Sequence, residues 1–168
     1  MTGDNDIKLS SVLNRIQNMM VSSGKTLSTA ESCTGGGLAS LITSIPGSSE
    51  YFQGALVAYQ NHIKIKMLSV SPETIERFDV VSENVVAEMV KGACKLFATD
   101  YAIATSGYAG PGKGSDKVPV GTICIAFGNA DDQHTLTICK DNGRSENVRN
   151  AVSVALNEFY EYLSNKLK

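Results

Sequence analysis

The stretch Thr29-Ala30-Glu31-Ser32-Cys33-Thr34-Gly35-Gly36-Gly37 joins two segments with different hydrophobic periods. The segment 25–30, which leads into this stretch, is rich in small and β-branched residues, as is typical of a strand. The residues after it are apolar at helical spacing, at Leu38, Leu41, Ile42 and Ile45. The sequence therefore predicts a strand, a glycine turn and a helix.

The glycine turn fits two interpretations. The first N–H groups of a helix have no internal partner, and glycines let an anionic or carbonyl oxygen approach them closely, so the turn fits a ligand site. It fits equally well an ordinary helix start that is capped by Ser32 or Thr34. Turn chemistry alone leaves both interpretations open.

The bulk composition is that of an ordinary globular domain. The 168 residues are 42% hydrophobic and 19% charged, and the formal net charge is −2. Because the chain is slightly acidic and has no basic run, we expect no nucleic-acid partner. No apolar run is long enough to span a bilayer, and the acidic first residues do not open a signal peptide. We therefore expect a cytoplasmic protein without a membrane partner.

Hydrophobic periodicity predicts helices that alternate with strands and then a hairpin. Strands are expected at 25–30, 51–59, 101–106, 120–128 and 135–139, with 51–59 buried and the last two forming an antiparallel hairpin. Helices are expected before Ser22, up to Ser44, over 60–68 and 72–78, after a cap at Ser82, and over 145–167. This order predicts one α/β domain over residues 1–168, a three-layer α/β/α sandwich with a mixed, mostly parallel sheet and an antiparallel edge hairpin.

Three polar loops are candidates for a site: the glycine turn, the turn 46–49 and the loop 107–115. Ligands in such folds gather beyond the carboxyl ends of the strands, so we expect the loops to meet there. The loop from Gly107 to Lys113 resembles part of a phosphate loop, but Gly114 stands where that pattern needs a Ser or Thr. The same loop fits a backbone nest for an anion or a solvated hairpin.

The residue types also indicate a nucleophile and a base. Ser48 and Ser49, with Tyr59 and Lys64, form the best set, because a partly desolvated lysine can activate a serine. Lys64 fits a solvated helix lysine as well. His62 and His134 fit surface positions. The four cysteines form no CxxC pair, so we expect neither a zinc site nor a disulfide framework, and three of them fit the core.

Six motifs in order resemble the CinA C-terminal domain family, the nicotinamide-nucleotide amidases. They are Thr29–Gly36, Pro46–Ser49, Val57–Asn61 with Lys64, Val81–Glu83, Ser106–Pro111 and Pro119–Thr122. The resemblance implies hydrolysis of the carboxamide of nicotinamide mononucleotide, a small-molecule nucleotide substrate, to nicotinate mononucleotide and ammonia. It also implies a homodimer, and we expect no metal and no cofactor.

Carried over by motif, the resemblance implies that Ser49 is the nucleophile, Lys64 its base and Tyr59 a relay or orienting residue. Ser32 is the alternative nucleophile, or holds substrate or the oxyanion together with Thr34. The other residues implied to bind substrate are Glu31, Gly35, Gly36, Asn61, Ser106, Gly107, Ala109, Gly110, Arg144 and Arg149. The family often has Gly-Asp-Arg before a Val-Arg pair, whereas this chain has Gly143-Arg144-Ser145, so either arginine can meet the phosphate.

Two other functions fit the same motifs. One is a non-catalytic module that binds pyridine nucleotides, and the other is an amidase for a different carboxamide. The intact set of Ser49, Tyr59 and Lys64 favours catalysis over binding alone.

Overall fold

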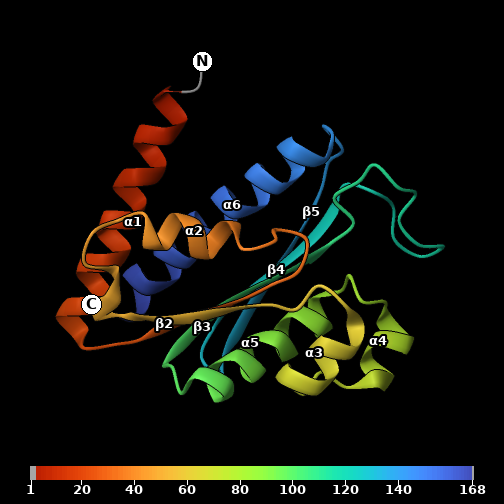
Figure 1. The fold of residues 1–168 in the computed structure, drawn as a ribbon, viewed down its shortest axis with the longest axis horizontal. Helices are drawn as coiled ribbons and strands as arrows, with labels where there is room; N and C mark the ends of the chain where they lie inside the picture. Colours follow the sequence, from red (N-terminus) through yellow and green to blue (C-terminus); the bar gives the residue numbers. More distant parts are fainter. Residues whose placement is uncertain (1–2, 168) are drawn as a thin grey trace.

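A computed structural model describes residues 3–167, in which one sheet separates two layers of helices (Figure 1). Residues 1, 2 and 168, the ends of the predicted domain, lie outside the described residues. The helices are α1 (Gly3–Ser23), α2 (Gly37–Thr43), α3 (Asn61–Leu68), α4 (Pro72–Phe78), α5 (Glu83–Phe97) and α6 (Arg144–Lys166). The strands are β1 (Leu27–Glu31), β2 (Phe52–Val57), β3 (Tyr101–Gly107), β4 (Thr122–Gly128) and β5 (Gln133–Cys139).

The five strands form one mixed sheet in the order β2-β1-β3-β4-β5. β1 pairs in parallel with both β2 and β3, whereas β4 runs antiparallel to β3 and β5. Only β4 therefore runs against the other strands of this sheet. The predicted three-layer fold, with a mostly parallel sheet and an antiparallel hairpin at one edge, is confirmed.

Each face of the sheet has its own hydrophobic core. Helices α1, α2 and α6 cover one face, and α3, α4 and α5 cover the other (Figure 1). The α5 side of the sheet is lined by small side chains, at Ala30, Ala102, Ala104 and Ala126, which lets α5 pack closely on the strands. None of the helices within residues 3–167 is both long and apolar enough to cross a membrane.

The prediction of a buried strand at 51–59 is wrong in part. β2 is shorter, and its side chains alternate between half-buried and exposed. The reason is that β2 is the edge strand of the sheet, next to β1 alone. Its carboxyl end leads directly into α3, which carries Lys64.

Helix α3 packs against α5 at Gly92, where only a residue without a side chain fits. A Cβ atom on Gly92 would lie 2.0 Å from the main-chain oxygen of Leu68, the last residue of α3. Leu68 lies one helical turn after Lys64, so this contact also holds the helix that carries the lysine.

We expect Gly92→Ala to lower the free energy of unfolding by about 2–3 kcal/mol, because the two helix backbones must move apart. Gly112→Ala is the control, since a Cβ there meets nothing within 4 Å, and its effect should stay within about 0.5 kcal/mol. Urea unfolding followed by circular dichroism measures both. Equal stability of the two variants would contradict this account of the α3–α5 contact.

Candidate active site

A cavity of about 420 Å³ opens where β1, β2 and β3 end. Its lining comes from the turn after β1, the start of α3, the segment between α4 and α5, the loop after β3 and the start of α6. The sequence-predicted residues in this lining are Ser32, Tyr59, Asn61, Lys64, Ser106, Gly107, Ala109, Gly110 and Arg144. The carboxyl edge of the sheet therefore brings together residues that are far apart in the sequence.

Lys64 and Ser32 meet inside this cavity. The Nζ atom of Lys64 lies 3.0 Å from Ser32 Oγ, and the lysine side chain is only 1% exposed. Nζ also donates to the main-chain carbonyl of Ala58 at 2.8 Å and to that of Tyr59 at 3.4 Å. Hence Lys64 is no solvated surface lysine.

Burial controls the protonation of Lys64. Loss of water lowers the pKa of this lysine to about 8, although the nearby Cys33 opposes that shift. Burial also raises the pKa of the Cys33 thiol to about 12, so the thiol stays protonated near neutral pH. A neutral lysine amine has two N–H donors and one lone pair, which matches two carbonyl acceptors and one serine hydroxyl.

The β1–β2 pairing sets the distance between the two residues. The Ala58 N–H donates to the Glu31 carbonyl at 2.7 Å, so it extends the parallel ladder by one step beyond β2. Ser32 follows Glu31 directly, and its own N–H donates to the carbonyl of Thr105 at the end of β3. Main-chain bonds thus fix both Ser32 and the carbonyl that holds Lys64.

Arg144 and Tyr59 lie at the mouth of the cavity. The Arg144 guanidinium donates to the Gly110 carbonyl at 2.8 Å and to the Tyr59 hydroxyl at 3.1 Å. The Tyr59 side chain is 54% exposed, and its hydroxyl bonds to Arg144. The contact of Tyr59 with Lys64 is made by the main-chain carbonyl. The structure therefore does not place the Tyr59 hydroxyl as a relay between serine and lysine.

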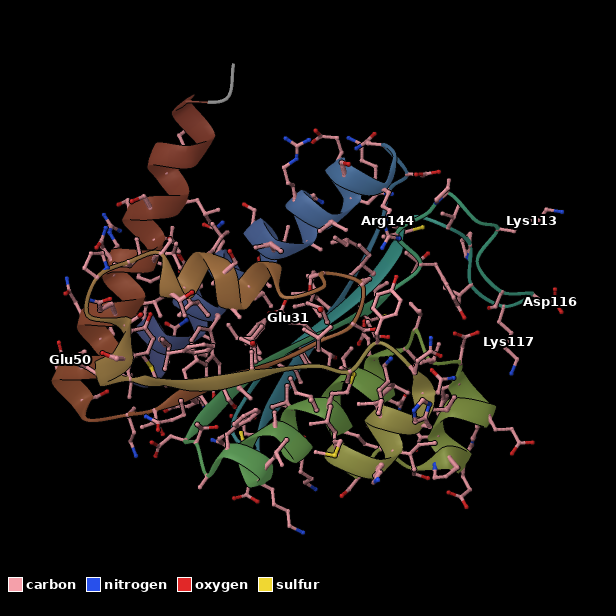
Figure 2. The ribbon with its side chains drawn as sticks, viewed as in Figure 1. Glu31, Glu50, Lys113, Asp116, Lys117 and Arg144 are labelled. Atoms are coloured by element: carbon pink, nitrogen blue, oxygen red, sulfur yellow. The ribbon has the colours of Figure 1, made fainter. Side chains whose placement is uncertain are left out.

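The predicted pair of Ser49 and Lys64 does not form. Ser49 is exposed in a short 3₁₀ helix, Ser48–Glu50, which precedes β2, whereas Lys64 follows β2. At about 3.3 Å per residue, the six residues of β2 separate the two ends by roughly 20 Å. Figure 2 shows Glu50, the neighbour of Ser49, at the left edge of the molecule and Arg144 well to the right of it. The turn 46–49 therefore does not join the other two loops.

Several residues predicted to bind substrate lie outside the cavity lining. The carboxylate of Glu31 is buried and accepts hydrogen bonds from the glycine turn, including one from the Gly36 N–H. The Thr34 hydroxyl bonds to Glu31 and to Thr105, and the Gly35 N–H bonds to the Ser32 carbonyl. These groups therefore shape the turn that carries Ser32.

The structure also separates the two arginine candidates. Arg144 lines the cavity, whereas Arg149 is exposed and paired with Glu146 at 2.6 Å. Arg149 is thus held on the surface of α6, one turn beyond the helix start.

Sequence reasoning missed part of the lining. The missed residues are Cys33, Val80, Val81, Tyr108, Gly112, Gly114 and Val120. The loop after β3 is held by Asp79, which accepts from the Tyr108 hydroxyl at 3.1 Å and from the Ser115 hydroxyl at 2.6 Å. Asp79 therefore anchors two points of this loop, whereas residues 111–114 between them are exposed. The aspartate and the loop are far apart in sequence, so no local signal connects them.

The prediction that three cysteines lie in the core is confirmed, because Cys33, Cys94 and Cys124 are buried. Cys139 is exposed. Within residues 3–167, no three His, Cys, Asp or Glu side chains are grouped in a way that could hold a metal ion. The titratable groups that the cavity does present are Lys64, Arg144, Cys33, Tyr59 and Tyr108.

Fold and site together define an α/β domain with a buried serine–lysine pair at the carboxyl edge of its sheet. A model of the CinA C-terminal domain matches residues 9–163. The chain therefore belongs to the CinA C-terminal domain family.

Curated relatives agree with this assignment. A CinA-like protein of Fervidobacterium nodosum is 47% identical over 128 residues, which are 76% of this chain and 29% of that protein. Another from Trichodesmium erythraeum is 45% identical over 130 residues, 77% of this chain and 30% of that protein. The chain thus spans less than a third of the length of these relatives.

Solved structures have the same fold. The competence damage-inducible protein A of Klebsiella pneumoniae superposes with a TM-score of 0.89 at 33% identity, covering 93% of this chain and 97% of that one. A competence or damage-inducible protein of Enterobacter asburiae gives 0.89 at 34% identity, with 92% and 98% covered. Both match nearly the full domain.

Proposed function

We propose that this domain is an amidohydrolase in which Ser32 is the nucleophile and Lys64 the base. The single observation that carries this proposal is the 3.0 Å contact between Ser32 Oγ and the buried Lys64 Nζ inside the cavity. A lysine with a pKa of about 8 is a neutral amine in roughly one molecule in ten at pH 7, enough to serve as a base.

The proposed reaction proceeds through an acyl-enzyme. Ser32 Oγ attacks the carboxamide carbon while Lys64 Nζ takes the serine proton. Lys64 then gives that proton to the leaving nitrogen, and the C–N bond breaks to release ammonia. Water attacks the resulting ester, Lys64 accepts a proton from it, and Ser32 leaves with that proton. The product is a carboxylic acid, which ionises to the carboxylate by giving its proton to ammonia or solvent.

The oxyanion needs a donor close to Ser32. Cys33 lines the cavity, and its main-chain N–H makes no hydrogen bond to another described residue. Because Cys33 directly follows the proposed nucleophile, its main-chain N–H can bind the developing oxyanion. Its buried, protonated thiol is a poor competing nucleophile because thiolate is the reactive form.

The proposed substrate is nicotinamide mononucleotide, on the strength of the motif resemblance. Arg144 supports an anionic substrate, since it lies at the cavity mouth at the start of α6, where the helix dipole also favours a phosphate. Its two hydrogen bonds to Gly110 and Tyr59 orient the guanidinium across the mouth. A bidentate contact to a phosphate is within the chemistry of this side chain.

The decisive experiment compares ammonia release from nicotinamide mononucleotide, nicotinamide and NAD, each with and without a chelator. Release of ammonia from the mononucleotide supports the proposal. If Ser32→Ala no longer releases ammonia, the activity belongs to this site. If none of the three compounds releases ammonia but the mononucleotide binds, a non-catalytic nucleotide-binding module explains the site better. Release from nicotinamide alone indicates an amidase for another carboxamide.

Arg144→Gln is expected to raise KM for the mononucleotide about 10-fold or more with little change in kcat, because a charge-assisted contact to the phosphate is lost. For the matching nucleoside, which lacks the phosphate, the same substitution should change KM little. Steady-state kinetics with both substrates measure this difference. Arg149→Gln is the control, since Arg149 pairs with Glu146 outside the cavity. An equal KM rise in both variants would remove Arg144 from the phosphate site.

A further inference from the structure

We infer that Glu31 is a positioning residue whose buried carboxylate holds the turn after β1 in the shape that aims Ser32 at Lys64. This inference rests on the proposed role of Ser32 as the nucleophile. Glu31 lies in the interior, between the sheet and α2, as Figure 2 shows. It does not line the cavity, so it acts through Ser32 rather than on substrate.

Five donors converge on the Glu31 carboxylate. Oε1 accepts from the Ala39 N–H at 2.9 Å and from the Thr29 hydroxyl at 3.2 Å. Oε2 accepts from the Thr34 hydroxyl at 2.7 Å and from two more N–H groups, those of Leu38 at 3.0 Å and Gly36 at 3.1 Å. Three of the five donors are main-chain groups of the turn and the first turn of α2.

The carboxylate is fully buried, with 0% exposure, and no Lys or Arg among the described residues bonds to it. Burying a carboxylate is costly unless hydrogen bonds replace its water. Here N–H groups at the start of a helix replace the water, and the helix dipole favours the negative charge. The turn and the carboxylate therefore stabilise each other.

This contact differs from an ordinary helix cap. The N-cap position of α2 is Gly36, which has no side chain, and Glu31 reaches it from five residues earlier. The intervening residues, 32–35, must fold back for the carboxylate to reach these donors. Consequently the path of the chain through Ser32 depends on Glu31.

The remaining bonds around Ser32 complete this arrangement. The Ser32 N–H is held by the Thr105 carbonyl at 3.0 Å, and the Ser32 carbonyl accepts from the Gly35 N–H at 3.1 Å. The Thr34 hydroxyl also lies 2.8 Å from the Thr105 hydroxyl, which ties the turn to β3. Ser32 Oγ is thereby held at Lys64 before substrate enters, as a preorganised nucleophile requires.

Glu31→Gln tests the inference, because the amide keeps the size of the side chain but offers one acceptor oxygen in place of two. Its NH2 group must then face donors, so part of the turn loses its partners. We expect kcat for ammonia release to fall about 10–100-fold with KM changed less than about 3-fold, since the loss lies in alignment rather than in binding. The pH midpoint of the rate should stay where the wild type has it, because the lysine keeps its surroundings.

The matched control is Glu88→Gln. Glu88 also accepts from a main-chain N–H, that of Ser71, and from a threonine hydroxyl, that of Thr74, but it lies outside the cavity lining. Both variants should lose stability, and only Glu31→Gln should lose kcat beyond the fraction that unfolds. If the fold does not survive Glu31→Gln, Thr34→Val removes one donor to the carboxylate and should lower kcat in the same direction, less strongly.

A second readout separates this inference from the proposed reaction. A fluorophosphonate reacts with activated serines whatever their natural substrate, so its labelling rate at Ser32 reports alignment directly. Slower labelling in Glu31→Gln than in Glu88→Gln supports the positioning role even if no carboxamide is hydrolysed. Equal kcat and equal labelling in the two folded variants would overturn it. A shifted pH midpoint in Glu31→Gln would also overturn it, because the carboxylate would then act on Lys64 through its charge.

Discussion

Ser32→Ala is expected to lower kcat for ammonia release by about 10³-fold or more, because the acyl-enzyme cannot form without the hydroxyl. Nucleotide binding should change little, since the cavity loses one oxygen atom and keeps its walls. The Ser32 Oγ–Lys64 Nζ contact is the basis of this expectation. Kinetics with nicotinamide mononucleotide, together with its binding to the variant by calorimetry, measure the two effects separately.

Ser49→Ala is the matched control, since it makes the same change at an exposed serine that precedes β2. We expect it to keep wild-type turnover within about 2-fold, as a surface substitution outside the site does. The opposite pattern, with Ser49→Ala inactive and Ser32→Ala active, would restore Ser49 as the nucleophile. In that case the contact between Ser32 and Lys64 would have only a structural role.

The sequence-based prediction paired Ser49 with Lys64 and kept Ser32 as the alternative, and strand direction explains why Ser32 is the serine that lies at the lysine. In a parallel pair the chain must return to the starting edge before the next strand begins, and here α2 makes that return. Residues before β2, such as Ser49, therefore lie at the far edge from residues after β2, such as Lys64. The glycine turn after β1 ends at the same edge as Lys64, because β1 and β2 are parallel neighbours.

Local signals predicted most of the fold. The cap at Ser82 is present, with its hydroxyl accepting from the Val85 N–H, and Ser71 caps α4 in the same way before Pro72. The hairpin of β4 and β5 also forms as expected. The position of β2 at the sheet edge was missed, because strand order depends on contacts between segments far apart in sequence.

The chemistry of Lys64 was beyond local prediction for the same reason. Its burial depends on the carbonyls after β2 and on the close approach of α3 to α5 at Gly92, none of which a helix pattern contains. Glu31 is similar: an acidic residue beside a glycine turn fits a ligand contact, and only the folded turn shows that all its partners are internal.

The rate of ammonia release should rise with pH through a midpoint of about 8. Burial lowers the pKa of Lys64 from 10.5 to about 8, and the neutral amine is the form that accepts the serine proton. The unfolded chain, in which the pKa is not lowered, binds more protons between these two values, so the contribution of this lysine to stability rises with pH across that window. A rate that is flat from pH 6 to 9 would contradict the assignment of Lys64 as the base.

The variants Lys64→Arg and Lys64→Met test whether catalysis needs Lys64 as a proton acceptor or only its positive charge. Arginine keeps the positive charge but holds its proton, so it cannot accept the serine proton, and we expect kcat to fall about 10³-fold. Methionine has a similar length and no charge, so kcat should fall as far, while the free energy of unfolding changes by no more than about 2 kcal/mol. In that variant the carbonyls of Ala58 and Tyr59 lose a donor, but no amine has to be buried.

Measurements of kcat and of urea unfolding on both variants distinguish the two explanations. If both fold and both are inactive, proton transfer by Lys64 is the property that matters. Substantial turnover by Lys64→Arg would instead make the side chain an electrostatic anchor, because a guanidinium supplies charge and hydrogen bonds but no free lone pair. The contribution of Lys64 to the pH dependence of stability between pH 8 and 10.5 should also be absent in Lys64→Met, because its amine is gone.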